Sequence, residues 1–321
     1  MPVPAILFPA DPLNPRRPDP HFAWEARLLR ELGGEHHLVD HDALLAGHAE
    51  EAVGQVPRDG GPLWYRGWML PSDRYAGFAT ALAVRGGALL TSAAGYLTAH
   101  ELPGWYGVFE GATPPSVWIP TAGTVAPRPA ELAAAVARLG GSGPAIVKDY
   151  VKSRKHEWHE ACYIPELADP AAVRRVVARF VELQGEFLAG GVVLRRYEEF
   201  ERRADGTGGG SADGVDDGSG GGSADRSGGG DGRAVEARVW WLDGEPVLVG
   251  PHPDAPHRTV EPDLTGVQPL VRTLGCRFIT TDLASRADGS GWRVVEVGDG
   301  QVSDLPRGID ASGLLASLIA A

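Results

Sequence analysis

The chain has 321 residues, of which 43% are apolar, and this is enough to form the cores of two domains. Its formal net charge of −12 at pH 7 argues against general binding to nucleic acids, and no apolar run reaches the roughly 18 residues needed to cross a membrane. Two cysteines cannot form a disulfide framework, and the N-terminal stretch lacks the basic start of a signal peptide. We therefore expect a cytoplasmic protein with reduced thiols.

The first part of the chain alternates apolar runs with amphipathic runs. These runs predict strands at 5–8, 36–40, 62–68 and 88–91, and helices at 19–34 and 72–87. Asp19 and Ser72 stand where helix N-caps are expected. Strands that alternate with helices form a parallel sheet covered on both faces, so residues 1–125 are predicted to form a Rossmann-like α/β domain. They contain no GxGxxG motif, so a dinucleotide is not inferred.

Residues 126–321 have a different pattern, in which short strands dominate. Helices are predicted at 130–140, at 169–187 and from residue 310. Strands are predicted at 144–151, 162–164, 191–197, 276–284 and 292–297, with a hairpin at 236–250. The hairpin turn is expected at Asp243-Gly244, a dipeptide typical of such turns. We therefore expect a second domain of the α+β class with antiparallel strands.

Residues 204–232 form a low-complexity insert with thirteen glycines and almost no apolar side chains. They contain six Asp and one Arg, which accounts for −5 of the net charge of −12. Such a segment cannot bury enough apolar surface to offset the entropy lost on ordering, so residues 204–233 are predicted to be disordered. Because a long loop costs little more to close than a short one, we interpret it as an expanded loop inside the second domain. An interdomain linker is the alternative.

Lys148 lies in an apolar run, AIVKDY, that is predicted to be a strand. One interpretation is that Lys148 faces a cleft, where a strand lysine is a good phosphate ligand. The alternative is that Lys148 is a surface lysine on an edge strand. Lys152, Arg154 and Lys155 follow within an otherwise acidic chain, and they could cover a polyphosphate. A solvated loop is the alternative for this run, but the aromatic residue Trp158 indicates that the loop folds onto another part of the protein.

Three carboxylates stand near the ends of the last two predicted strands. Asp282 lies in the first of these strands, Glu296 lies in the second, and Asp299 follows the second. If these strands pair as a hairpin, the carboxylates can converge. Oxygen ligands suit Mg²⁺, which binds through a few carboxylates together with substrate phosphates. A metal would explain why acidic residues stand among valines, because a buried carboxylate is costly unless it is paired or holds a metal. A salt bridge to Arg277 or Arg293 is an equally good interpretation.

These segments together resemble the ATP-grasp superfamily. In that superfamily a strand lysine precedes a phosphate-covering loop, a hinge strand contacts adenine, and two late acidic strands hold Mg²⁺. The corresponding segments are AIVKDYVKSRKHEW, VVLRRYEEF, and FITTDLA with GWRVVEVGDG. The ending VE-x-GDGQV-S-LP is similar to that of a bacterial and phage clade marked by an arginine and paired lysines. The resemblance implies that a Rossmann-like domain precedes a two-lobed ATP-grasp domain, with a small lobe at about 126–190 and a large lobe at about 191–321.

The resemblance also implies roles for individual residues around the phosphates of ATP. Lys148 would grip the α- and β-phosphates, and Lys152 and Lys155 would reach the phosphates from the loop. Arg238 would contact the γ-phosphate or an acyl-phosphate. Lys152 and Arg238 are therefore the candidate catalytic residues.

Further roles concern the adenosine and the metal. On the hinge strand, Leu194 and Tyr197 would lie beside the adenine. Glu198 or Glu199 would lie near the adenine or the ribose. The Mg²⁺ ligands implied by the resemblance are Asp282, Glu296 and Asp299. Many ATP-grasp enzymes end the last strand with Glu-x-Asn, and Gly298 stands here in place of that Asn, so Asp299 would have to substitute as a ligand.

The implied reaction is the ATP-dependent joining of a carboxylate to an amine through an acyl-phosphate. The substrate would be a small molecule, an amino acid or a peptide, bound between the two halves of the chain. Arg66 and His100 could meet a substrate carboxylate there, or could be ordinary polar residues of the core. A phosphotransferase on the same scaffold and a non-catalytic nucleotide-binding module are the two alternatives.

Overall fold

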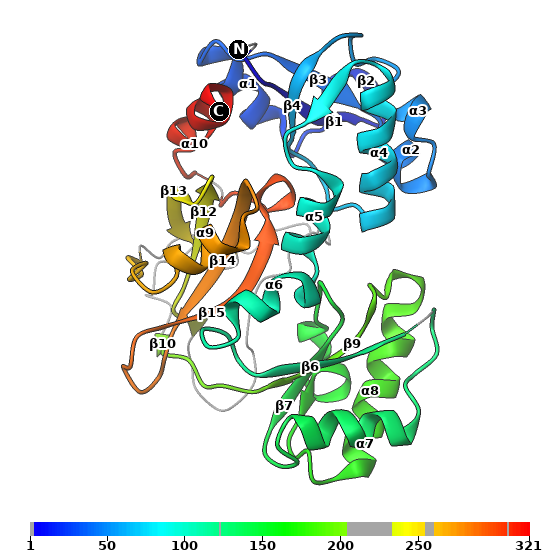
Figure 1. Ribbon diagram of the computed structural model, residues 1–321, viewed down its shortest axis with the longest axis vertical. Helices are drawn as coiled ribbons and strands as arrows, with labels where there is room; N and C mark the ends of the chain where they lie inside the picture. Colours follow the sequence, from blue (N-terminus) through cyan, green and yellow to red (C-terminus); the bar gives the residue numbers. More distant parts are fainter. Residues whose placement is uncertain (1–2, 122, 204–232, 254–259, 307) are drawn as a thin grey trace.

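The computed structural model describes residues 3–121, 123–203, 233–253, 260–306 and 308–321. The predicted disordered insert at 204–233 lies outside this part, apart from its last residue. The three larger sheets of the described residues follow one another along the long axis of the molecule (Figure 1). No helix within the described residues has both the length and the apolar character needed to cross a membrane.

The N-terminal domain is built on a five-stranded sheet. Its strands are β1 (Ala5–Asp11), β2 (Asn14–Pro18), β3 (His36–Val39), β4 (Gly61–Tyr65) and β5 (Gly87–Leu89). β1 pairs in parallel with β3 and with β4, β4 pairs in parallel with β5, and β2 adds an antiparallel strand that the sequence did not predict. The predicted Rossmann-like domain is confirmed.

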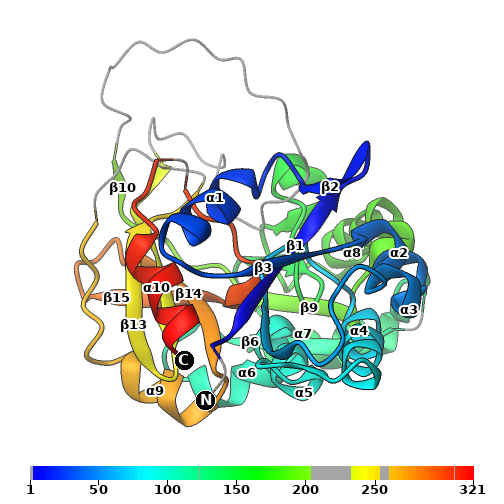
Figure 2. The ribbon, with the colours of Figure 1, turned by 90° about the horizontal axis from the view of Figure 1, so that it is seen from above.

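Helices cover both faces of this sheet, as predicted. The helices on one face are α2 (His41–Ala46), α3 (Ala49–Ala52) and α4 (Ser72–Val84). The helices on the other face are α1 (Ala23–Glu31) and the C-terminal α10 (Ser312–Ala320). The C-terminal helix therefore packs on the N-terminal domain, and Figure 2 shows α10 beside β13 and close to the chain's N-terminus.

Two predicted helix starts are wrong in detail. Helix α1 begins at Ala23, because the Asp19 carboxylate accepts a hydrogen bond from the backbone N–H of His21 (2.8 Å) and closes a turn before the helix. Ser72 is the first residue of α4 and not its cap, and its hydroxyl donates to Glu101 instead (2.6 Å). Both side chains are used for tertiary or turn contacts that a local pattern does not show.

Two short helices, α5 (Ala93–His100) and α6 (Leu102–Phe109), connect the N-terminal domain to the rest of the chain. Buried side chains of α6, including Trp105 and Phe109, pack against buried residues of the last two strands, such as Val297. The connection is therefore part of the core that supports the C-terminal sheet.

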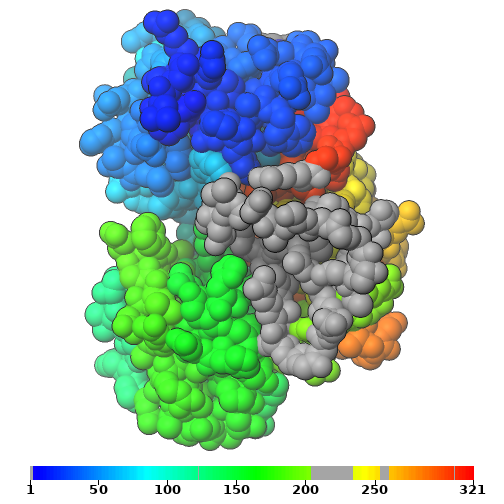
Figure 3. All heavy atoms as spheres, turned by 180° about the vertical axis from the view of Figure 1, so that it is seen from behind, coloured from blue at the N-terminus to red at the C-terminus, as the bar shows by residue number. Residues whose placement is uncertain are grey.

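The small lobe contains a four-stranded antiparallel sheet in the order β6-β9-β7-β8. The strands are β6 (Ser116–Pro120), β7 (Ala145–Lys148), β8 (Tyr163–Ile164) and β9 (Gly191–Arg196). Helices α7 (Pro129–Arg138) and α8 (Pro170–Gln184) pack on the sheet and form its core. Strand β6 was not predicted, and it pairs with β9. In the view from behind, this lobe in green and the N-terminal domain in blue stand at opposite ends of the molecule (Figure 3).

The large lobe is a four-stranded antiparallel sheet in the order β13-β12-β14-β15. Its strands are β12 (Glu236–Leu242), β13 (Glu245–Pro251), β14 (Phe278–Ser285) and β15 (Trp292–Asp299), and helix α9 (Gln268–Leu274) precedes β14. The predicted turn between β12 and β13 is confirmed, since Asp243 (φ 49°) and Gly244 (φ 83°) both adopt the positive φ angles of a type I′ turn. Strands β10 (Arg202–Arg203) and β11 (Arg233–Ala234) pair beside this sheet.

Candidate active site

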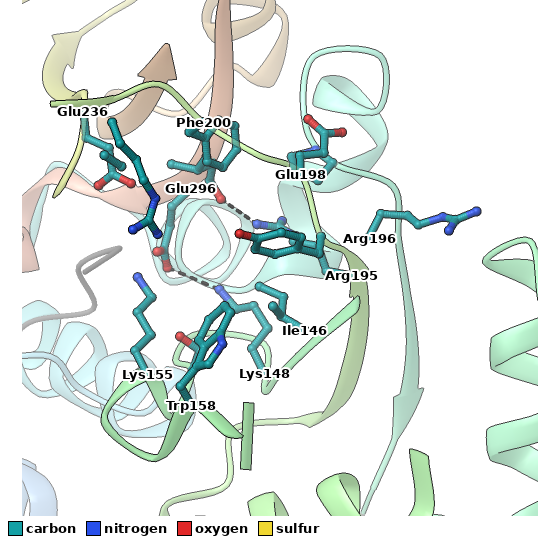
Figure 4. A pocket seen from close by; sticks show the side chains of 16 residues that line it. Ile146, Lys148, Lys155, Trp158, Arg195, Arg196, Glu198, Phe200, Glu236 and Glu296 are labelled. Carbon is teal, nitrogen blue, oxygen red and sulfur yellow. Dashed lines mark hydrogen bonds and ion pairs between the residues drawn. The ribbon is translucent and has the colours of Figure 1, made fainter. Parts of the chain in front are cut away.

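A cavity lies between the sheets of the small and large lobes, and it encloses about 760 Å³ including its open mouth. Its walls come from β7, β9 and β15 and from the loop after β7. Four of the residues assigned to the nucleotide by sequence line this cavity, Lys148, Lys155, Tyr197 and Glu198, and so does one predicted metal ligand, Glu296. Figure 4 shows these walls from close by. We call it the first cavity.

Lys148 is the last residue of β7 and points into the first cavity. Successive residues of a strand face opposite sides, so Val147 joins the core under α8 while Ile146 and Lys148 line the cavity. The buried Lys148 ammonium lies 3.4 Å from the Glu296 carboxylate on β15 (Figure 4). Burial lowers the pKa of Lys148, and Glu296 offsets part of this effect. This ion pair joins the two lobes.

The loop after β7 is shaped by Asp149. Its buried carboxylate accepts hydrogen bonds from the backbone N–H groups of Val151 (2.7 Å) and Lys152 (2.5 Å) and from the Gln184 side chain (2.7 Å). The resulting turn separates the two loop lysines. Lys155 faces the first cavity, whereas Lys152 faces a second one. Burial lowers the pKa of Lys152, although Asp149 and Glu296 oppose this shift.

Aromatic rings gather at the mouth of the first cavity. Two short helical turns, η1 (Lys155–Glu157) and η2 (Trp158–Cys162), follow the loop, and the second is a π-helical turn, a form often found at functional sites. Trp158 stacks on Tyr163 (5.2 Å between ring centroids) and meets Tyr197 edge-on (6.1 Å). Trp158 and Tyr197 both line the cavity. The rings provide a flat apolar wall next to Lys148.

The hinge strand β9 presents Arg195 to the cavity, and not Leu194. Leu194 packs in the core of the small lobe, on the face of the sheet turned away from the cavity, so it does not lie where an adenine contact was predicted. Arg195 was missed by sequence reasoning. Its guanidinium donates to the Val295 carbonyl (2.6 Å) and to the Ser116 hydroxyl (2.9 Å), and burial lowers its pKa to about 10.

The two candidate ribose contacts differ in their surroundings. Glu198 lines the first cavity and forms two hydrogen bonds of 2.9 Å each with the Arg293 guanidinium on β15. Glu199 is exposed and does not line the cavity. Arg293 therefore pairs with Glu198, and not with the carboxylates at the strand ends for which it was considered.

Arg238, Asp282 and Glu296 form one row across three neighbouring strands. In the antiparallel register Arg238 of β12 is opposite Asp282 of β14, which is opposite Glu296 of β15. Arg238 binds Asp282 through two hydrogen bonds (2.7 and 2.8 Å). Burial acts to raise the pKa of Asp282, but the Arg238 guanidinium outweighs it and holds that pKa well below its usual range. The expected salt bridge therefore exists with Arg238, while Arg277 pairs with Asp243.

Asp299 does not join this row. It is separated from Glu296 by three residues along β15, and in a strand this places it on the opposite face. Its buried Oδ1 accepts hydrogen bonds from the backbone and side-chain nitrogens of Gln301 (2.9 and 3.1 Å), and burial raises its pKa to about 7. Within the described ranges, no group of three His, Cys, Asp or Glu side chains is arranged to hold a metal ion. All three predicted carboxylates nevertheless line one cavity, the second cavity described below, and their joint role as ligands stays a prediction.

The remaining pair, Asp282 and Glu296, still suits a magnesium ion. Their carboxylates project from directly paired positions on one face of the sheet. The carboxylate of Glu296 also contacts Lys148 of the first cavity. Mg²⁺ commonly binds proteins through one or two carboxylates and takes its other ligands from phosphates and water. These two residues fit such a site when a polyphosphate is present.

A second cavity, of about 630 Å³, lies on the other side of Glu296. Lys152, Arg238 and His252 line it, together with His100 of α5. Burial lowers the pKa of His100 to about 4, with Lys152 and Lys148 adding to the shift, so this imidazole is neutral at pH 7. Glu296 belongs to both cavities, so the two spaces meet at the Lys148–Glu296 pair.

Arg66 does not reach either cavity. It is fully buried, and two of its nitrogens donate to the Glu25 carboxylate of α1 (2.9 Å each). A third nitrogen donates to the carbonyls of Gly300 (2.8 Å) and Ser303 (2.9 Å). Arg66 therefore meets a carboxylate of the protein itself. The contacts tie the turn after β15, η4 (Gly300–Val302), to the N-terminal domain.

Comparisons with known proteins agree with this geometry. No curated protein sequence matches the chain. Among solved structures, it is similar to D-cycloserine synthetase DcsG (TM-score 0.57, 15% identity, 98% of each chain covered). It is also similar to a RimK-domain ATP-grasp protein of Sphaerobacter thermophilus (0.55, 14%, 99% of this chain and 100% of that one). A third neighbour is the ATP-grasp ligase PsnB in complex with a minimal precursor, Mg and ADP (0.52, 15%, 98% and 97%).

At these identities the structural likeness shows the fold alone, and this fold agrees with the predicted order of a Rossmann-like domain followed by an ATP-grasp domain. The sequence match is more specific. A family model for an ATP-grasp domain, family 3 of the clade named for one arginine and two lysines, matches residues 138–318, which is more than half of the chain. The match spans β7, the loop after β7 and both acidic strands. The resemblance predicted from sequence is confirmed, and the chain belongs to this arginine-and-two-lysine clade of the ATP-grasp domain family.

Proposed function

We propose that this protein is a Mg-ATP-dependent ligase that joins a carboxylate to an amine through an acyl-phosphate, forming an amide or peptide bond. One observation carries the proposal. Lys148 and Glu296 meet across the two lobes at the place where the two cavities join. A phosphate ligand and a candidate metal ligand thus stand between a space for a nucleotide and a space for a substrate. Phosphoryl transfer depends on positioning and charge neutralisation more than on a covalent nucleophile.

The first cavity would hold the nucleotide. Trp158 and Tyr197 offer aromatic faces for the base, and Lys148 and Lys155 offer cations for the phosphates. Mg²⁺, when bound, would neutralise phosphate charge and orient the oxygens for transfer. Asp282 and Glu296 would hold it, because they are cross-strand partners on one face of the sheet. Arg195 would keep the hinge strand fixed against β15 by its bond to the Val295 carbonyl.

The second cavity would hold the substrates. Lys152 and Arg238 supply cations there, which suits a carboxylate and the acyl-phosphate formed from it. A closed space between lobes would also keep water from the acyl-phosphate. The names of the structural neighbours support this class of reaction, since DcsG is a synthetase and PsnB is a ligase bound to a precursor. We propose an amino acid, a peptide or another small molecule as substrate, and the cytoplasm as the place of action.

A non-catalytic nucleotide-binding module is the second candidate, and one observation favours it. Gly298 stands where many ATP-grasp enzymes carry a metal-binding Asn, and Asp299 is buried on the opposite face of β15. Two carboxylates instead of three could bind a nucleotide without turning it over. A phosphotransferase on the same scaffold is also consistent with the cations of the second cavity.

A turnover screen separates these possibilities. The protein is incubated with Mg-ATP and a pool of amino acids and peptides, and ADP and product masses are recorded together. A ligase releases ADP only when carboxylate and amine are both present and gives a condensed product. A phosphorylated product would identify a phosphotransferase instead. Binding of ADP without turnover in any pool would leave the non-catalytic module. Glu296→Gln should abolish ADP formation in this screen. Its matched control, Glu199→Gln, should not, since Glu199 is exposed and lies outside both cavities.

A further inference from the structure

A histidine–aspartate pair at the edge of the second cavity has no role in the function proposed above. His21 lies in the turn between β2 and α1 of the N-terminal domain, and Asp304 follows η4. His21 Nε2 and Asp304 Oδ1 are 2.6 Å apart, a short hydrogen bond. Asp304 lines the second cavity together with Arg238 and Glu296. The pair thus brings the N-terminal domain to the edge of the candidate substrate space.

The structure holds the His21 ring in place on several sides. The ring packs against Trp68 (4.5 Å between centroids) and Phe22 (4.8 Å). Its backbone N–H donates to one oxygen of Asp19 (2.8 Å), and the Trp68 indole N–H donates to the other (3.3 Å). Surface ion pairs are seldom supported in this way, because two flexible side chains lose entropy when they are fixed. These contacts fix the position of the His21 ring, and its hydrogen bond in turn fixes the orientation of the Asp304 carboxylate.

Four acids line the second cavity, and one of them, Asp299, is fully buried on the opposite face of β15, which leaves Asp282, Glu296 and Asp304 to meet a cation. Asp282 is engaged by Arg238 through both of its oxygens and, like Glu296, is already a candidate magnesium ligand. Glu296 faces Lys148 and is a candidate magnesium ligand. In the part of the chain that the structure describes, the Asp304 carboxylate has one hydrogen-bonded side-chain partner, the imidazole of His21, and that bond engages Oδ1 alone. Arg238 Nη1 lies 3.4 Å from the backbone carbonyl oxygen of Asp304, so the two residues stand at the same part of the second cavity.

We propose that Asp304, oriented by His21, binds the ammonium group of the amine substrate and accepts its first proton. This inference rests on the ligase function proposed above. The substrate class is therefore a primary amine that is protonated in solution. Such an amine cannot attack while its nitrogen carries three protons, so a base near the acyl-phosphate is required. Asp304 would touch the substrate, and His21 would be a positioning residue.

The step balances as follows. One proton passes from the ammonium to the Asp304 carboxylate, which leaves a neutral amine with a free electron pair. The nitrogen then bonds to the acyl carbon, and the bond between that carbon and the phosphate oxygen breaks. The departing phosphate takes a second proton from the nitrogen, which becomes the amide nitrogen. The proton on Asp304 then leaves to solvent, because the Asp304 side chain is partly exposed.

The test compares two nucleophiles in the presence of Mg-ATP and the same pool of amino acids and peptides. The amines of the pool are ammonium ions at neutral pH, whereas added hydroxylamine is uncharged and traps an acyl-phosphate as a hydroxamate. We compare the wild type with Asp304→Asn, Asp304→Glu, His21→Gln and a control, Asp42→Asn. Asp42 is an exposed acid of the N-terminal domain that does not line the second cavity, so its substitution removes the same charge elsewhere.

For Asp304→Asn, we expect the pool concentration that gives half-maximal ADP release to rise about 10- to 100-fold. A change of this size corresponds to the loss of one charge-assisted hydrogen bond. Hydroxamate formation should stay within about twofold of the wild type. Asp304→Glu should recover part of the loss, His21→Gln should show a smaller loss in the same direction, and Asp42→Asn should match the wild type.

Two results would overturn the assignment. One is an Asp304→Asn protein with unchanged use of the pool amines. The other is a parallel loss of hydroxamate, which would make Asp304 structural. A wild type that forms no hydroxamate and releases no ADP would instead refute the ligase function, and this inference with it.

Discussion

The buried ion pair between Glu25 and Arg66 provides a prediction about stability that needs no substrate. The change is Glu25→Gln, which keeps the shape of the side chain and removes its charge. Removing one partner of a buried pair costs about 3–5 kcal/mol, because the other charge stays buried without compensation. Arg66 keeps its backbone carbonyl acceptors on the turn after β15, so we expect the lower end, about 3 kcal/mol. The melting temperature should fall by about 6–12 °C, since about 1 kcal/mol corresponds to 2–4 °C in domains of 150–250 residues.

The measurement is thermal and urea unfolding followed by tryptophan fluorescence, which reports on Trp64 of β4 and Trp68 beside this pair. The control is Glu131→Gln, which removes an acid of the same type from an exposed pair with Arg128 (2.8 Å) and should leave the melting temperature unchanged. If Glu25→Gln unfolds at the same temperature as this control, the pair does not hold the turn after β15 to the N-terminal domain, and our explanation of Arg66 is wrong.

Two further predictions concern the candidate site. Burial raises the pKa of Asp299 to about 7, so the folded protein holds a proton that the unfolded chain releases from about pH 4 upward, and the free energy of unfolding should fall as the pH rises from about 4 to about 7. In Asp299→Asn, the free energy of unfolding should no longer fall over this pH range, which urea titrations at several pH values measure. Mg-dependent ADP binding should be kept, and its loss would show that Asp299 is a metal ligand. Trp158→Leu should weaken ADP binding about tenfold in calorimetry, because stacking of a base on an aromatic ring is worth about 1–3 kcal/mol, and an unchanged affinity would show that the base lies elsewhere.

Local patterns predicted the elements that local chemistry determines. The Asp243-Gly244 turn was found because few residues adopt two successive positive φ angles, and the apolar run around Lys148 was found because strand residues alternate. The carboxylates Asp282 and Glu296 were expected to converge, and the hairpin register places them opposite one another.

The errors concern features that depend on distant parts of the chain. Strand β6 was missed because its partner β9 lies about 75 residues later, with two helices in between. Leu194 was chosen and Arg195 was missed because a strand that is buried on both faces gives no sign of which residue faces a cavity. The partner of Asp282 was sought among nearby arginines, whereas the register of β12 supplies Arg238.

Asp299 shows a further reason why a site cannot be read from spacing alone. The residue was chosen because it follows Glu296 closely in sequence. A β-strand has a period of two, so a separation of three residues moves a side chain to the other face. There the neighbouring Gln301 binds its carboxylate. Asp299 still lines the second cavity with Asp282 and Glu296, so its role as a metal ligand stays a prediction.

The proposal as a whole requires that a nucleotide and Mg²⁺ bind at the Lys148–Glu296 pair, and calorimetric titration with ADP in the presence and absence of Mg²⁺ measures this without a known substrate. We expect one ADP per chain, with an affinity that falls about 10- to 100-fold in Lys148→Ala, since a charge-assisted hydrogen bond is lost. In Glu296→Gln, the gain in affinity from Mg²⁺ should disappear, while Glu199→Gln should bind like the wild type. Binding that is equally tight and equally Mg-dependent in all four proteins would show that the nucleotide does not occupy this cavity.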